Sequence, residues 1–258
     1  MSAPLLQIDN LSLDIAGNSL CQGLNLQIQR NECWALLGRN GAGKTTLLQC
    51  LLRLRDISAG RIRVQGKNLN SIPRRQLAAQ VGMLFQESVD ALPATVIETV
   101  MLGRHPYSQS LLSDDEADIA LARKALLELG LESFAQRRID SLSGGERQRL
   151  ALAMLLAQQP DLYLLDEPSN HLDIAFQTRL LDLLTTKIHD QGGSVIMATH
   201  DINLASRYCE KILLMLPKGK HLVGSRQKVL TEHNLSVAYG CEVRLLRCAE
   251  GPDFFYPA

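Results

Sequence analysis

A glycine-rich loop that ends in a lysine carries the clearest chemistry in the sequence. The run Gly38-Arg39-Asn40-Gly41-Ala42-Gly43-Lys44-Thr45 matches the phosphate-binding pattern G-x-x-x-x-G-K-[ST]. An apolar stretch at 33–37 precedes it and a stretch of helical composition at 46–52 follows it, which is the strand-to-helix context that the pattern requires. In such a loop, backbone N–H groups face an anion, the lysine reaches the terminal phosphates, and the Thr45 hydroxyl binds Mg²⁺. The loop predicts a site for a nucleoside triphosphate.

Two adjacent carboxylates follow an apolar strand. Asp166 and Glu167 come directly after the run 162–165, and ligands of open parallel sheets gather at the carboxyl ends of strands. Asp166 is a candidate to hold Mg²⁺, directly or through water, and Glu167 is a candidate to polarise the attacking water. The alternative is that both residues only open the turn before Pro168.

Two further polar side chains follow strands. His200 comes after the apolar run 194–198 and Thr199, where its ring can donate to a γ-phosphate oxygen and orient the base or the water. Gln86 comes after the run 81–85, where its amide can reach Mg²⁺ or the water. Together with the phosphate loop, four strand ends are expected to converge on one site.

A second anion site is predicted at Leu142-Ser143-Gly144-Gly145-Glu146. Ser143 is a good cap for a helix that runs to about residue 158, and Gly144 and Gly145 leave its first turn open. Backbone N–H groups and the Ser143 hydroxyl would then face an anion. Since one chain already has one triphosphate cradle, the second nest favours an assembly in which each copy offers a half-site to the nucleotide of another.

The surrounding pattern predicts the elements that position these residues. Residues 5–28 alternate as antiparallel strands around a turn at Gly17-Asn18, and 61–65 alternates again after a turn at 58–60. A helix at about 174–189 lies between the apolar runs 162–165 and 194–198, which predicts a β-α-β crossover and a parallel sheet.

The segment 87–158 is helical in character. A capping box is predicted at Ser113-Asp114-Asp115-Glu116, and the helix after it places one apolar face toward the core before Gly130 ends it. The tail beyond Gly224 is weakly patterned, and no function is assigned to it.

Composition limits the class of protein. The chain has 258 residues, 46% hydrophobic and 21% charged, which suits one large α/β domain. Lys+Arg and Asp+Glu balance at 27 each, so net charge gives no support for a nucleic-acid partner. No apolar run approaches a membrane span, the N-terminus lacks the features of a signal peptide, and the six cysteines are scattered. The expectation is a cytosolic protein with reduced, mostly buried thiols.

These motifs together resemble those of the ATP-binding cassette (ABC) ATPases in order and spacing, over nearly the whole chain. The resemblance implies one ABC ATPase domain over 1–258: an α/β P-loop NTPase core with a mainly parallel sheet, an N-terminal antiparallel β subdomain and an inserted α-helical subdomain at about 87–158, followed by a tail at about 225–258. It implies ATP and Mg²⁺ as ligands, with the nucleotide on Gly38 to Thr46.

In that family two cassettes dimerise head to tail around two ATP molecules. The resemblance implies that Ser143, Gly144 and Gly145 of one copy face the γ-phosphate held by Lys44 of the other, and that Asp173 lies at the dimer seam. Family members usually place an aromatic residue on the adenine, and here that position looks like Ile15. An aliphatic contact should weaken affinity and selectivity for the base.

The segment 93–107 resembles cassettes that serve bacterial importers of metal chelates: ferric siderophores, haem and cobalamin. This implies a homodimer beneath two transmembrane permease subunits, peripheral on the cytoplasmic face of the inner membrane and working indirectly with a substrate-binding protein. Alternatives are a soluble cassette protein that acts on nucleic acid or the ribosome, and the ATPase of an exporter or lipid transporter. No long coiled-coil insertion or second cassette supports the soluble alternative.

Overall fold

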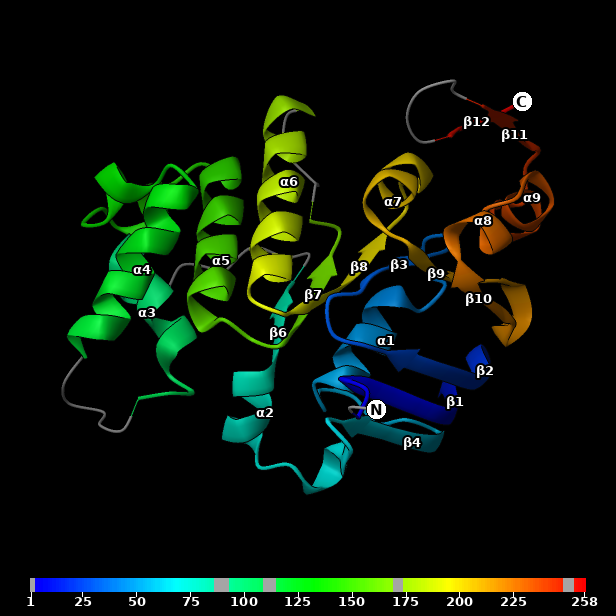
Figure 1. The fold of residues 1–258 in the computed structure, drawn as a ribbon, viewed down its shortest axis with the longest axis horizontal. Helices are drawn as coiled ribbons and strands as arrows, with labels where there is room; N and C mark the ends of the chain where they lie inside the picture. Colours follow the sequence, from blue (N-terminus) through cyan, green and yellow to red (C-terminus); the bar gives the residue numbers. More distant parts are fainter. Residues whose placement is uncertain (1–2, 86–92, 109–114, 169–173, 248–252) are drawn as a thin grey trace.

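A six-stranded, mainly parallel sheet forms the centre of the computed structural model, which describes residues 3–85, 93–108, 115–168, 174–247 and 253–258 (Figure 1). In spatial order the strands are β10 (His221–Ser225), β9 (Lys211–Met215), β3 (Cys33–Leu37), β8 (Ser194–Thr199), β7 (Leu162–Asp166) and β6 (Val81–Leu84). All neighbours pair in parallel except β10 and β9. Every residue of β6, β7 and β8 is buried, because both faces of this sheet are covered.

The two faces of the central sheet support separate cores. Alternate residues of one strand point to opposite faces, so Ala35 and Leu37 of β3 join one cluster while Trp34 and Leu36 join the other. One core lies under the helices drawn above the sheet in Figure 1, and the other lies against α1 (Lys44–Leu51) and a second sheet.

The second sheet is antiparallel and comes from the start of the chain. Its order is β2 (Asn18–Ile28), β1 (Leu6–Ile15), β4 (Ala59–Val64) and β5 (Lys67–Asn68), which confirms the expected opening strands. The predicted turn at 58–60 is wrong in part, because β4 already begins at Ala59. Gly60 has φ +96, and a Cβ there would lie 2.5 Å from the Asn10 carbonyl oxygen, so a glycine lets the two backbones approach.

Helices supply the remaining cover. They are α2 (Arg74–Gln80), α3 (Val96–Met101), α4 (Glu116–Glu128), α5 (Gly144–Gln158), α6 (Ile174–Asp190), α7 (Ile202–Tyr208), α8 (Arg226–Val229) and α9 (Glu232–Tyr239). Single turns of 3-10 helix are η1 (Leu69–Ser71), η2 (Leu102–Arg104), η3 (Glu132–Phe134), η4 (Ile139–Ser141) and η5 (Pro217–Gly219). α3, α4 and α5 pack together beyond β6, and the hairpin β11 (Val243–Leu246) and β12 (Phe254–Pro257) lies at the opposite end of the molecule (Figure 1).

The start of α4 corrects one local prediction. Asp115, not Ser113, caps the helix, because its carboxylate accepts a hydrogen bond from the Ala117 N–H at 3.0 Å. Glu116 is therefore the first helical residue and cannot close a capping box with Ser113, which lies outside the described residues. The expected apolar face is present, since Ala122, Leu126 and Leu129 are buried.

Two expectations from composition concern thiols and membrane spans. Cys21, Cys33, Cys50, Cys209 and Cys241 are all free thiols, and Cys248 lies outside the described residues. Within the described part of the chain, no helix combines the length and the apolar character needed to cross a bilayer.

Candidate active site

The phosphate loop connects β3 to α1, as its sequence context requires. Gly43 precedes the helix with φ +99, and a Cβ there would lie 3.0 Å from the side chain of Leu20. Gly38 is equally constrained, since its Cβ would meet Met215 and Ala42 at 3.1–3.2 Å. Side chains at these two positions would push the loop away from its neighbours, so glycine sets its close curl.

Lys44 is held inside the loop. Its side chain is buried, its ammonium donates to the Gly38 carbonyl at 2.9 Å, and it lies 3.9 Å from Oε1 of Glu167. Burial lowers the pKa of Lys44, and the charges of Glu167 and Asp166 oppose that shift. The ammonium thus lies between the loop backbone and two carboxylates, where the charge of a phosphate group would offset its loss of solvent.

Asp166 is the last residue of β7 and is 1% exposed. Neither of its carboxylate oxygens has a hydrogen-bond partner among the described residues. Burial raises the pKa of Asp166 and the charge of Glu167 adds to that rise, while the Lys44 charge and the nearby Thr45 hydroxyl, which lies close but outside hydrogen-bond geometry, act in the opposite direction. Unsatisfied buried oxygens beside a hydroxyl form a donor set that suits a hard cation such as Mg²⁺.

Glu167 turns away from β7 toward β8. Its N–H donates to the Ala198 carbonyl at 2.9 Å, and its φ of 50° lies in the left-handed region. Its carboxylate is buried, and Oε2 lies 2.9 Å from Nδ1 of His200, whose side chain is 60% exposed. An ionised carboxylate can only accept, so when Glu167 is ionised this contact requires the hydrogen on Nδ1, which leaves Nε2 for another partner. One pair thereby links a buried acid to an exposed ring.

These residues line one cavity of about 600 Å³. Its lining comprises Ile15, Ala16, Asn18, Leu20, Arg39, Asn40, Gly41, Ala42, Gly43, Lys44, Thr45, Thr46, Asp166, Glu167 and His200. Three neighbouring strands, β3, β8 and β7, therefore bring their carboxyl ends to the same hollow. Ile15, at the end of β1, lies on the cavity wall in the place where the sequence suggested a contact with the base.

Ser143 and its glycines do not line this cavity. The expected cap is confirmed: the Ser143 hydroxyl accepts from the Glu146 N–H, and Glu146 accepts from the Ser143 N–H at 2.7 Å. These bonds to Ser143 lower the pKa of Glu146. Nothing lies within 4 Å of a Cβ placed on Gly144 or Gly145, so the start of α5 is open to a second molecule.

Two predicted site residues cannot be placed. Gln86 and Asp173 both lie outside the described residues, so their roles remain predictions.

Sequence reasoning missed the closeness of the C-terminal tail to the site. Arg39, Asn40 and His200 also line a neighbouring cavity of about 510 Å³, whose other wall includes Tyr239 of α9 and Tyr256 of β12. The Arg39 guanidinium lies 3.3 Å from where a Cβ of Gly240 would be. No short-range pattern could reveal this contact, because about 200 residues separate its two sides.

Comparison with known proteins decides the family. The sequence profile described as ABC transporter matches residues 21–170. The chain belongs to the ABC transporter family of ATP-binding proteins. Membership confirms the predicted fold class, the ATPase activity and ATP as the nucleotide.

Among relatives of this ABC ATPase is the petrobactin import ATP-binding protein FpuD of Bacillus anthracis, 36% identical over 88% of this chain and 83% of its own. The uncharacterized ABC transporter ATP-binding protein YvrA of Bacillus subtilis is 36% identical over 93% of this chain, which spans 55% of YvrA.

Two solved structures agree with this fold. An inward-facing putative metal-chelate type ABC transporter shares 28% identity with a TM-score of 0.85, covering 99% of this chain and 98% of the other. A dimeric ATP-binding cassette in a post-hydrolysis state with ADP and Pi shares 26% identity with a TM-score of 0.75, covering 86% and 98%.

Proposed function

We propose that this ABC ATPase drives a bacterial importer of a metal chelate, such as a ferric siderophore, haem or cobalamin. Support comes from the import relative FpuD and from the metal-chelate type transporter, which this chain matches along 99% of its length. The proposed site of ATP hydrolysis rests on one observation: Lys44, Asp166, Glu167 and His200 line the same cavity.

Each side chain of the cavity has a proposed task. Lys44 neutralises the β- and γ-phosphates of ATP, which the loop N–H groups of Gly38 to Thr46 surround. Asp166, Thr45 and Gln86 hold Mg²⁺, which would neutralise charge that develops on the phosphates. Glu167 accepts a proton from the attacking water, and His200 keeps Glu167 in place and contacts the γ-phosphate. The hydrogen bond between Glu167 and Nδ1 of His200 supports this division of tasks.

The second half-site is proposed to act on the nucleotide of another copy. The open start of α5 and its absence from the cavity of the same chain support this arrangement. Ser143, Gly144 and Gly145 would contact the γ-phosphate across a head-to-tail homodimer, with Asp173 at the seam. Because ATP bridges both half-sites and ADP does not, the nucleotide binds the closed dimer more tightly and shifts the equilibrium toward it.

The transport partners are two permease subunits and, through them, a substrate-binding protein. In this arrangement the ATPase is peripheral on the cytoplasmic face of the inner membrane, and the loop after Gln86 together with the segment 93–107 meets the permease. Val96 and Val100 of α3 are fully buried and serve the core, whereas Leu102 is 49% exposed and is free to contact another protein.

The test of the catalytic assignment is Glu167→Gln. This change keeps the shape of the side chain but removes the base, so ATP turnover should fall about 10²–10⁴-fold while ATP binding persists. Turnover is measured by phosphate release, and dimerisation by light scattering after size exclusion with Mg-free ATP. Near-native turnover would refute the role of Glu167 as the base.

The transport assignment needs a separate experiment. The protein is co-reconstituted in liposomes with candidate permeases, and uptake of labelled ferric siderophore, haem and cobalamin is measured with ATP and Mg²⁺. ATP-dependent uptake of one of them supports the proposal. Coupling only to outward or lipid movement would favour the exporter alternative.

A further inference from the structure

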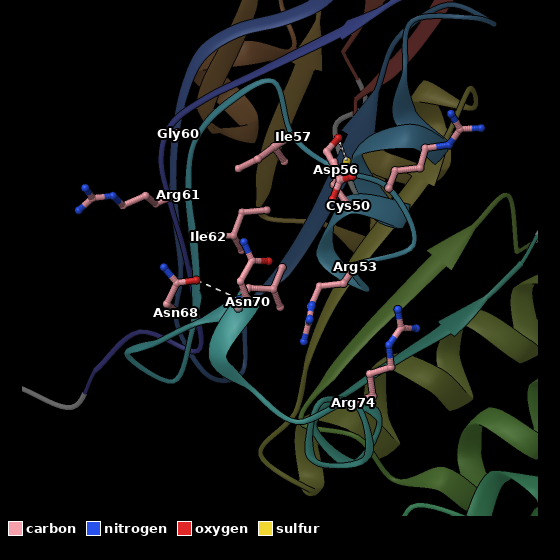
Figure 2. Close-up of a pocket in the computed structure, with 12 residues that line it drawn as sticks. Cys50, Arg53, Asp56, Ile57, Gly60, Arg61, Ile62, Asn68, Asn70 and Arg74 are labelled. Carbon is pink, nitrogen blue, oxygen red and sulfur yellow. Dashed lines mark hydrogen bonds between the residues drawn. The ribbon is translucent and has the colours of Figure 1, made fainter.

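A further hollow in this protein has several arginines in its lining (Figure 2). Its volume is about 500 Å³, and its lining comprises Cys50, Arg53, Arg55, Asp56, Ile57, Gly60, Arg61, Ile62, Asn68, Leu69, Asn70 and Arg74. These residues come from the end of α1 and the loop after it, from β4, from β5, from η1 and from the start of α2. None of them lines the nucleotide cavity.

The charge of this region contrasts with the rest of the chain. From Arg53 to Arg75 the sequence holds seven Lys or Arg residues and one acid, Asp56, although the whole chain has a net charge of zero. Some arginines of the chain are paired with acids, as in Arg104 with Asp118 at 2.7 Å and, within this region, Arg63 with Asp9 at 2.6 Å. In the described structure, no ion pair neutralises Arg53, Arg55, Arg61 or Arg74.

The hollow has a fixed arginine and apolar walls in addition to its charge. Arg53 is fixed by a hydrogen bond from Nη1 to the Ile72 carbonyl at 2.7 Å, which leaves the other edge of its guanidinium available. Arg53, from the loop after α1, and Arg74, at the start of α2, both line the hollow, whereas Arg61 points outward from β4 in Figure 2. Apolar walls such as Ile62 and Leu69 lower the local dielectric, which strengthens the field of the two guanidinium groups.

We propose that this pocket binds a phosphate group. Two or more guanidinium groups around one hollow, with a single carboxylate in the lining, are best balanced by a ligand that carries two negative charges and several acceptor oxygens. A single carboxylate would satisfy only one guanidinium fork. The phosphate can belong to a free phosphorylated molecule or to a phospholipid headgroup, and the side-chain amide of Asn70, which faces the hollow, adds a further donor.

The test must separate this pocket from the phosphate loop. Pyrophosphate binding is measured by calorimetry in Lys44→Ala protein without Mg²⁺, or, should that variant not fold, in native protein saturated with a non-hydrolysable ATP analogue. One site per chain is expected, with an affinity that falls as salt rises. Arg74→Gln removes a guanidinium that has no hydrogen-bond or ion-pair partner among the described residues, and it should weaken pyrophosphate about tenfold.

Matched variants test whether the effect of Arg74→Gln is specific to the pocket. Lys67→Gln removes a charge from the same segment outside the pocket lining and should leave pyrophosphate affinity within about twofold. Arg74→Lys should recover only part of the affinity, since a lysine lacks the planar fork. ATP turnover of Arg74→Gln in otherwise native protein should be unchanged, because Arg74 does not line the nucleotide cavity.

The source of the phosphate is read from a parallel sedimentation assay. Vesicles of phosphatidylcholine with phosphatidic acid are compared with phosphatidylcholine alone. Binding that needs phosphatidic acid and is lost in Arg74→Gln identifies a headgroup, and binding of pyrophosphate alone identifies a free ligand; both support the pocket. Absence of binding to either probe, or equal binding by native protein and Arg74→Gln, would overturn the proposal.

Discussion

Two glycine-rich helix starts in this ABC ATPase differ in what surrounds them. The loop before α1 is packed against Leu20 and Met215, and it holds a buried lysine close to acids from β7. The start of α5 is open, and the side chains that hydrogen-bond to its backbone are its own Ser143 and Glu146. A helix N-terminus attracts an anion in either setting, but only the first is completed by residues from other strands. The start of α5 needs residues from a second molecule to complete an anion site.

The largest expected effect comes from the complete site. Lys44→Ala removes the cation that lies 3.9 Å from Glu167 and leaves two carboxylates to repel the phosphates. ATP affinity should fall about 100-fold or more, as measured by titration calorimetry. Lys67→Ala, an exposed control outside the cavity, should bind ATP as the native protein does. Unchanged affinity of Lys44→Ala would mean that the loop alone holds the phosphates.

The open helix start should respond differently. Ser143→Arg places a long cation where the γ-phosphate from another copy is proposed to enter, yet it leaves the cavity of its own chain intact. Monomer affinity for ATP should stay within about twofold, whereas ATP-induced dimerisation of a Glu167→Gln background should be lost. Dimers that still form with Ser143→Arg would remove the distinction between the two helix starts.

A substitution at Asp166 measures how much folding stability is lost by burying its charged carboxylate. Its pKa is raised in the folded protein by burial, so the folded state holds the proton more tightly than the unfolded state does. The charged carboxylate therefore destabilises the fold above the ordinary carboxyl pKa range, and this penalty disappears below it. Asp166→Asn should stabilise the nucleotide-free protein by about 1 kcal/mol near pH 7.

The advantage of Asp166→Asn should shrink toward zero as the pH falls below about 4. Urea titrations of both proteins at several pH values check this dependence. A stability difference that does not change with pH would show that packing, not charge, sets the cost at Asp166.

The smallest effect is expected at Ile15, where the cavity wall is predicted to contact the adenine ring. Ile15 lines the wall and is 36% exposed, so an aromatic ring has room to stack there. Ile15→Tyr should tighten ATP binding by about 1 kcal/mol, or roughly fivefold, and should increase preference for ATP over GTP. Ile15→Leu is the matched control and should leave both quantities nearly unchanged.

Local pattern was enough to predict the main elements and the chemistry of their ends. The phosphate loop, the cap at Ser143 and the acids at the end of β7 depend on short-range rules of glycine conformation, side-chain capping and strand ends. The capping box predicted at Ser113 is wrong because Asp115, two residues later, accepts a hydrogen bond from the first turn of the helix.

The sequence predicted that strand ends converge, but only the tertiary structure showed which strands are neighbours and what else lies beside the site. Three strand ends meet because β3, β8 and β7 are neighbours in the sheet, an order that the chain order does not give. The same applies to the tail beside Arg39 and to the arginine pocket between α1, β4 and α2. Residue types fix what each side chain can bind, whereas long-range packing fixes which side chains lie close enough to bind one ligand together.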